Sequence, residues 1–268
     1  MTRLEQIIAN IAENKTPCVF ISPHLDDAMF SAGGLISELS EKTDVTIVTI
    51  FTNCESSRPT LSMKKFLNIN GYPNNQEDLF SVRRKEDIRA CQSARIKFIH
   101  LGFTDALWRK KIKPGLISRI LGSIFPEFIH LYPFYRFNII SGAPAKGDSI
   151  TIGNVKESLL NLADKIGNAV IFCPIGVGNH VDHIIARNIC TEIFANPIFW
   201  IDFPYNQNYM PDDNFISKMS LVPCSWNKNL QKKFNLILKY GTQKIDAEQI
   251  ISGDSANNSE ETFYIIKK

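Results

Sequence analysis

The chain has 268 residues, a length within the range of one large α/β domain. Hydrophobic residues make up 44% of it and charged residues 21%, which is ordinary for a globular protein with a sizeable core. Lys and Arg number 30 against 27 Asp and Glu, and this net charge of +3 does not suggest a nucleic-acid binder or a polybasic membrane anchor.

The first residues have the pattern of an amphipathic helix, with Leu4, Ile7, Ile8 and Ile11 on one face. This segment lacks the continuous apolar region and small-residue cleavage site of a secretory signal. No apolar run approaches the ~20 residues that span a bilayer. The six cysteines show no C-x-x-C spacing and are too few for a disulfide scaffold. We therefore expect a cytoplasmic protein with reduced thiols and no membrane span.

Short apolar runs alternate with amphipathic stretches along the chain. Runs rich in apolar residues predict strands at 18–22, 45–51, 97–101, 169–173 and 198–203. Helical periodicity predicts helices at 34–42, 81–94, 154–166 and 181–194. Strands that alternate with helices imply a mostly parallel sheet with helices on both faces, which is a three-layer α/β sandwich.

Two regions, 52–76 and 103–148, are the least regular. The second is dense in aromatic residues, Pro and Gly, and includes the aromatic stretch from Phe125 to Phe137. In a compact α/β domain such an excursion is typical of a lid or substrate loop. The alternative is an insertion packed on the surface with no role in binding. With no internal repeat, the simplest organisation is one domain over 1–268, with a lid or substrate loop around 103–150.

Three of the five histidines fall in two short acidic motifs. The first, Ser22-Pro23-His24-Leu25-Asp26-Asp27, directly follows the first predicted strand, and the second, Gly178-Asn179-His180-Val181-Asp182-His183, follows strand 169–173. In open α/β sheets ligands bind beyond the carboxyl ends of the strands. The two motifs can therefore converge in one site although they are more than 150 residues apart.

The residue types of the two motifs fit a hydrolytic zinc site. Catalytic zinc commonly takes two His and one carboxylate and keeps one position for water. If His24 and Asp27 bind the metal, Asp26 is an additional acid that can act as a general base. One of His180 and His183 is likewise left to donate a hydrogen bond to an oxyanion. A structural hydrogen-bonding role for a lone His, or helix capping by Asp26 or Asp27, is the alternative.

The two motifs together resemble those of a known family. Pro23-His24-Leu25-Asp26-Asp27, followed by His180-Val181-Asp182-His183, resembles the PIG-L/LmbE family of zinc-dependent de-N-acetylases. Arg83-x-x-Glu86-x-x-x-Ala90 is similar to a helix of that family, and Leu101-Gly102-x-x-Asp105 to one of its turns. The resemblance covers most of the chain. It implies a Rossmann-like sandwich with its active site at the carboxyl ends of the strands.

The resemblance also implies roles for individual residues. It implies one zinc ion per chain with three ligands: His24, Asp27 and His183. Asp26 would be the general base, and His180 would stabilise the oxyanion or protonate the leaving amine. Asp182 would tune or orient His180. Arg83 and Asp105 match positions that hold sugar hydroxyls in members that act on sugars.

One departure from the family pattern concerns the residue after the two aspartates. Many members read H-P-D-D-E, and here the last position is Ala28, as in a branch with D-D-A. Any interaction that the glutamate makes in those members, such as a salt bridge to the helix that contains Arg83, is therefore in doubt for this chain. The alternative role for Arg83 itself is an ion pair with Glu86 on the same helix face.

The implied reaction is hydrolysis of an N-acetyl group of an acetamido sugar or related glycoconjugate, which gives acetate and a free amine. The partner would be a small acetylated amino-sugar substrate, without nucleic acid, and the chain could form an oligomer. One alternative is a zinc-dependent amidase that acts on another small amide, such as a thiol conjugate or an antibiotic precursor. Another is a non-catalytic binding module of the same fold.

Overall fold

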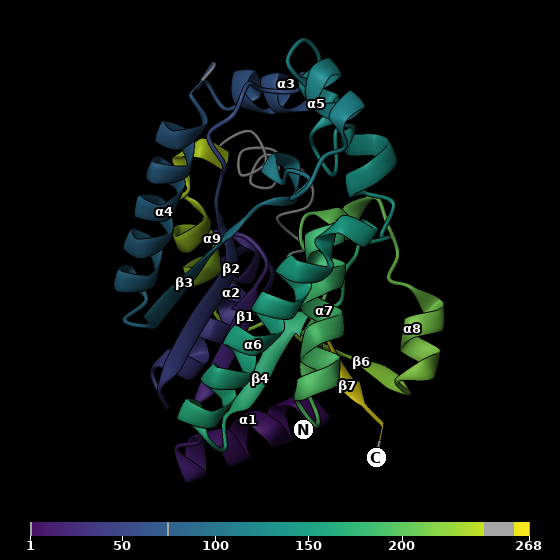
Figure 1. The fold of residues 1–268 in the computed structure, drawn as a ribbon. Helices are drawn as coiled ribbons and strands as arrows, with labels where there is room; N and C mark the ends of the chain where they lie inside the picture. Colours follow the sequence, from purple (N-terminus) through teal and green to yellow (C-terminus); the bar gives the residue numbers. More distant parts are fainter. Residues whose placement is uncertain (1, 74, 244–259, 268) are drawn as a thin grey trace.

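Seven strands form a single sheet in the computed structural model, which describes residues 2–73, 75–243 and 260–267. They are β1 (Cys18–Ser22), β2 (Val45–Asn53), β3 (Lys97–Thr104), β4 (Val170–Pro174), β5 (Ile198–Trp200), β6 (Leu221–Trp226) and β7 (Glu261–Ile266). Their order in the sheet is β3-β2-β1-β4-β5-β7-β6 (Figure 1). β1 to β5 are parallel, whereas β7 is antiparallel to both β5 and β6.

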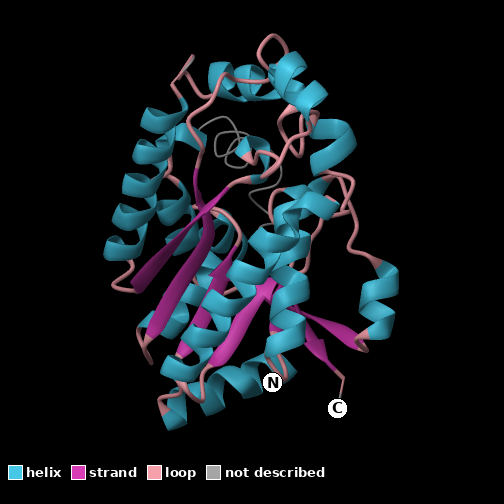
Figure 2. Ribbon diagram, viewed as in Figure 1, coloured by secondary structure: helices cyan, strands magenta, loops and turns pink. Residues whose placement is uncertain are grey.

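Helices cover both faces of this sheet (Figure 2). The helices are α1 (Arg3–Asn14), α2 (Asp27–Ser40), α3 (Leu61–Ile69), α4 (Gln76–Ser93), α5 (Leu116–Gly122), α6 (Ser149–Ile166), α7 (Val181–Ile193), α8 (Asp213–Lys218) and α9 (Leu230–Ile237). None of the helices in the described part of the chain has the length and apolar character that a bilayer crossing requires.

The central strands supply both halves of the core. In β1, Cys18 and Phe20 pack with α1, α2 and α9, whereas Val19 and Ile21 pack with α3, α6 and α7. Successive side chains of a strand point to opposite faces of the sheet, which explains this division. The predicted α/β class, a mostly parallel sheet between two helical layers, is therefore confirmed.

The helix predicted at 34–42 begins seven residues earlier, at Asp27. The Gly33-Gly34 pair, which stands at the start of the predicted helix, lies inside α2. A Cβ at Gly34 would lie 2.8 Å from the carbonyl oxygen of Lys228, so glycine allows the chain before α9 to pack against α2. The close approach of another backbone, and not a turn, is the reason for glycine here.

Inside α2 the helix is irregular and is tied to the last strand. Ala32 leaves helical values, with φ −132° and ψ 16°. The N–H groups of Gly34 and Leu35 donate to the carboxylate of Glu261 in β7, at 2.7 and 2.9 Å. The Lys233 ammonium lies 3.2 Å from the same carboxylate, so this buried charge is paired.

Candidate metal and catalytic site

The two motif loops lie at adjacent strand ends. β1 pairs with β2 on one side and with β4 on the other, so a crevice opens between the loops that follow β1 and β4. His24 and Asp26 lie in the loop after β1, and Asp27 is the first residue of α2. His180 is the N-cap of α7, and His183 lies in its first turn. The convergence that the sequence predicted is present in the structure.

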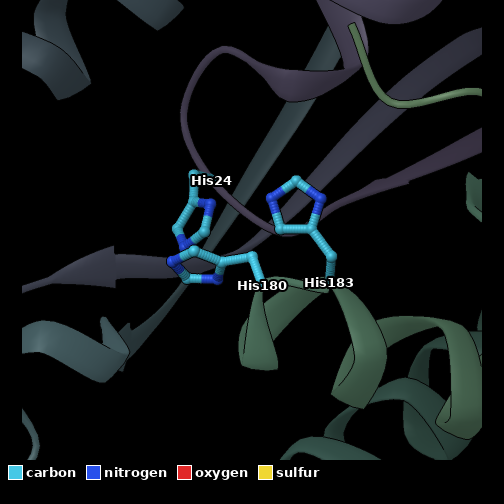
Figure 3. A group of neighbouring side chains, drawn as sticks. All are labelled: His24, His180 and His183. Carbon is cyan, nitrogen blue, oxygen red and sulfur yellow. The ribbon is translucent and has the colours of Figure 1, made fainter. Parts of the chain in front are cut away.

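The three histidine rings gather in one buried cluster (Figure 3). Their centroids are 4.9 Å apart for His24 and His180, 5.2 Å for His24 and His183, and 5.3 Å for His180 and His183. One ring nitrogen from each lies within 4.8 Å of the others, so the three could share a metal ion. A second group with the same property joins His24 to Asp105 and Asp182.

The carboxylate of Asp27 lies between two of these rings. Its Oδ2 is 3.1 Å from His24 Nδ1 and 3.3 Å from His183 Nε2. The 3.3 Å contact does not have the geometry of a hydrogen bond, and the buried His183 Nε2 has no hydrogen-bond partner among the described residues. A buried nitrogen without a partner is costly unless something else binds it. Two imidazole nitrogens and one carboxylate oxygen that converge in this way fit a divalent metal such as zinc.

The opposite nitrogen of each of these two rings faces a buried carboxylate. His183 Nδ1 donates to Asp202 Oδ1 at 2.7 Å, and His24 Nε2 lies 3.2 Å from Asp182 Oδ2. Histidines that bind metals usually donate their second ring N–H to a carboxylate, which fixes the tautomer and the ring orientation. Such a donation leaves a lone pair on His183 Nε2 and on His24 Nδ1 that can bind a metal beside the Asp27 carboxylate.

Asp182 was expected to orient His180, but its carboxylate lies elsewhere. Oδ2 accepts from the Ala106 N–H at 2.9 Å and faces His24, while Oδ1 pairs with the guanidinium of Arg109. Arg109 is buried and also pairs with Asp148, so it holds Asp182 in place. Only the main-chain N–H of Asp182 contacts His180, where it donates to Nδ1 at 3.2 Å.

Asp26 occupies the N-cap position of α2 but makes no side-chain capping bond. Its two oxygens accept from Arg83 Nη2 at 3.3 and 3.2 Å. Burial raises the pKa of Asp26 to about 6, although the Arg83 charge opposes the shift. Arg83 is therefore not paired with Glu86, whose carboxylate instead accepts from the N–H and Oγ1 of Thr242.

The histidines differ in charge preference. Burial lowers the pKa of His180 well below its usual value, and the neighbouring His24 and His183 lower it further. His180 is therefore neutral near pH 7, and because its Nδ1 accepts the Asp182 N–H, the proton is on Nε2. Burial also lowers the pKa of His183, but Asp27 and Asp202 outweigh that effect and raise it to about 9, so a metal that binds Nε2 would displace a proton from this ring.

A cavity with an aromatic wall opens beside these groups. Its walls include His24, Asp26, Asp27, Phe66, Arg83, Asp105, Leu107, Trp108, Tyr135, His180, Tyr205 and Gln243. Asp105 Oδ2 lies 3.5 Å from His24 Nε2, and its Oδ1 accepts from the Leu107 N–H at 2.8 Å. The cavity is lined by all residues that the sequence predicted for the site, with two exceptions. Asp182 and His183 lie behind it and contact the lining residues His24 and Asp27.

Some important residues of the site were given no role from the sequence. Asp202 falls inside the predicted strand 198–203, whereas β5 ends at Trp200, so Asp202 lies two residues beyond the carboxyl end of the strand. Arg109 carries no comparable signal, because one arginine in an irregular segment is normally exposed. Tyr205 packs edge-on against His183, with ring centroids 5.6 Å apart, and follows Asp202 by three residues.

Comparison with known proteins agrees with this geometry. Residues 19–194 match the PIG-L family, described as GlcNAc-PI de-N-acetylase. The chain belongs to the PIG-L family. This confirms the family that the motifs suggested. Ala28 of this PIG-L chain is 1% exposed and packs in the core, so a glutamate at this position would enter an apolar cluster.

Other proteins similar to this PIG-L chain are described as deacetylases. The 2'-N-acetylparomamine deacetylase of Streptomyces fradiae is 23% identical over 192 residues, which cover 70% of this chain and 57% of that protein. The chain thus spans little more than half of this relative's length. The fold is shared with a deacetylase of teicoplanin biosynthesis (TM-score 0.72, 20% identity, 93% and 97% of the two chains covered). It is also shared with a zinc-inhibited teicoplanin deacetylase (TM-score 0.69, 20% identity, 93% and 97% covered).

Proposed function

We propose that this chain is a metal-dependent hydrolase that removes the N-acetyl group of an acetamido sugar. The observation that carries the proposal is the position of Asp26, a carboxylate of raised pKa, beside the converging donors of His24, Asp27 and His183. The family, and the relatives described as deacetylases, support the same reaction class. The products would be acetate and a free amine.

The proposed metal ligands are His24 Nδ1, a carboxylate oxygen of Asp27 and His183 Nε2. Asp182 and Asp202 would orient the two rings through their opposite nitrogens. When bound, zinc or a similar divalent ion supplies an activated water and polarises the amide carbonyl. Six free cysteines, five of them buried, agree with the reducing cytoplasmic location that is part of this proposal.

The residues of the chain would carry the proton transfers. Asp26 accepts a proton from the attacking water as the new C–O bond forms, and it delivers a proton to the amide nitrogen as the C–N bond breaks. A base with a pKa of about 6 is mostly ionised at neutral pH and can return the proton. His180 is neutral and carries its proton on Nε2, so it donates a hydrogen bond to the developing oxyanion. We therefore prefer this role to protonation of the leaving amine by His180.

A single sugar ring fits the size and lining of the site. The cavity has a volume of about 280 Å³, close to the lower end of the range for small-molecule sites. Phe66, Trp108 and Tyr135 offer aromatic surface to a sugar, and Asp105 and Arg83 offer polar atoms to its hydroxyls. Because Asp105, Trp108 and Tyr135 belong to the segment 103–150, we propose that this segment is the substrate loop.

The test combines metal loading with acetate release. Metal-free protein would be titrated with zinc up to one equivalent, because a relative is described in a zinc-inhibited form, and assayed on N-acetylglucosamine derivatives and acetylated aminoglycoside precursors. We expect acetate release that depends on the metal, and we expect His183→Ala to lose both zinc and turnover. Full zinc occupancy in His183→Ala would remove this residue from the ligand set. Turnover of other amides without any release of acetate from sugars would favour a general amidase.

A further inference from the structure

A large apolar surface lies over α3, α5 and the segment that follows α5. We call it the cap surface, and its exposed apolar residues are Leu61, Ile69, Ile112, Leu116, Ile117, Ile120, Ile124, Phe125, Phe128, Phe134 and Phe137. Figure 1 shows α3 and α5 together at one end of the molecule, beyond the carboxyl ends of the parallel strands. Exposed apolar residues that gather in one region of a globular protein point to an interaction site.

The short helix α5 presents apolar side chains to solvent and does not bury them. Leu116, Ile117 and Ile120 are 64%, 73% and 60% exposed. Arg119 lies among them and is exposed as well. A surface helix normally directs such residues into the core, so their exposure here is unfavourable in water unless a partner covers them.

The charge of this region is strongly positive although the net charge of the chain is small. Segments 55–69 and 103–148 hold ten Lys and Arg against four Asp and Glu, which is +6, whereas the whole chain is +3. Two of these four acids, Asp105 and Asp148, are buried. Six exposed basic residues lie in the same segments as the cap surface, and none forms an ion pair with a carboxylate of the described chain: Arg58, Lys64, Lys65, Lys113, Arg119 and Arg136.

The cap surface is continuous with the catalytic cavity. A groove that includes Ile69, Phe134 and Phe137 shares Phe66, Leu107 and Tyr135 with the cavity wall. A second groove, between α3 and the segment after α5, shares Phe134 with the first. The two grooves therefore connect the segment after α5 with the mouth of the site.

We propose that the cap surface docks on an anionic phospholipid bilayer and brings the cavity mouth to the membrane. Apolar side chains that enter the interface, together with neighbouring basic residues, are the features that bind a protein reversibly to anionic lipid. A second copy of the chain is a poorer occupant, because a symmetric dimer through this face would bring two +6 regions together. The proposal does not depend on the catalytic chemistry.

Vesicle sedimentation with the full-length protein tests the docking. Vesicles of phosphatidylcholine with phosphatidylglycerol would be compared with vesicles of phosphatidylcholine alone. We expect binding to the anionic vesicles that weakens as salt rises. The double variant Ile117→Glu/Ile120→Glu, and separately Lys113→Glu/Arg119→Glu, should each weaken binding about tenfold or more.

The matched control is Leu238→Glu, which changes a leucine of similar exposure (59%) after α9, outside the cap surface, and should bind as the unaltered protein does. Circular dichroism would confirm that all variants are folded. Failure to bind anionic vesicles at low salt overturns the proposal, as does equal loss of binding in the control. A dimer in solution that the α5 variants dissociate would also overturn it, because the cap surface would then be a contact between copies.

Discussion

The replacement of Asp202 by asparagine tests the proposed metal site without any knowledge of the substrate. Asp202 Oδ1 accepts from His183 Nδ1 at 2.7 Å, and Oδ2 accepts from the N–H groups of Gly176 and Val177 at 2.7 and 2.8 Å. Asparagine has only one acceptor oxygen. If that oxygen stays with the two main-chain N–H groups, its NH₂ faces His183 and favours the tautomer with the proton on Nε2.

The tautomer with the proton on Nε2 cannot bind a metal through that atom. Loss of a carboxylate partner of a histidine ligand typically costs 10- to 100-fold in metal affinity, which is about 1.4–2.7 kcal/mol. We therefore expect the zinc dissociation constant of Asp202→Asn to rise by about 10- to 100-fold. Competition with a fluorescent zinc chelator would measure it.

The chain offers a closely matched control for this experiment. His100 Nε2 and Asp87 Oδ2 form another His–Asp pair of the same 2.7 Å length, away from the proposed ligands. Asp87→Asn should leave the zinc affinity unchanged. The thermal melting temperatures of the two metal-free variants would show whether both are folded. Wild-type zinc affinity in a folded Asp202→Asn variant would refute the assignment of His183 Nε2 as a ligand.

Three further predictions concern turnover. Asp26→Asn should keep zinc but lose about 10²- to 10⁴-fold in kcat, because the proton acceptor is gone. His180→Ala should keep zinc and lose about 10²- to 10³-fold in kcat, because the oxyanion loses a donor. Arg83→Met should move the acidic limb of kcat/KM to higher pH by about 1–3 units, because the Arg83 charge lowers the pKa of Asp26, while Arg84→Met should not move it.

Each of these predictions can fail in a defined way. A group that acts as base must be ionised, so activity falls as pH drops through the pKa of Asp26, and a higher pKa must move this limb upward. If the acidic limb of kcat/KM does not move in Arg83→Met, the group that titrates in this limb is not Asp26. Near-normal kcat in Asp26→Asn would exclude it as the base. A loss of zinc from His180→Ala would show that His180 is a ligand and not an oxyanion donor.

The parallel core of the fold could be predicted from the sequence because its strands and helices have strong local patterns. Apolar runs such as 18–22 and 45–51 became β1 and β2, and Leu4, Ile8 and Ile11 form the buried face of α1. β6 and β7 were not predicted. Buried and partly buried side chains alternate along β7 but not regularly along β6, and the two strands pair through residues about 40 positions apart.

The candidate site was predictable to the extent that its residues share short motifs at strand ends. The residues that orient those motifs are distant in sequence, and no local pattern marks them. Arg109 reaches Asp182 from 73 positions away, and Asp182 reaches His24 from 158 positions away. Asp182 was predicted to orient His180 because the two residues are close in sequence. In the folded chain its carboxylate contacts the ring of His24 instead.

The contact between α2 and β7 has a consequence for the order in which the protein forms. Glu261 receives two N–H groups of α2 across 227 and 226 positions, and β6 joins the sheet through β7, which lies between it and β5. Contacts of such sequence separation form late, because the loop between them must close first. During synthesis from the N-terminus, the helix that starts at Asp27 therefore obtains its final backbone partners only after Glu261 has left the ribosome. The first loop of the proposed metal site is therefore synthesised well before the partners of the helix that follows it.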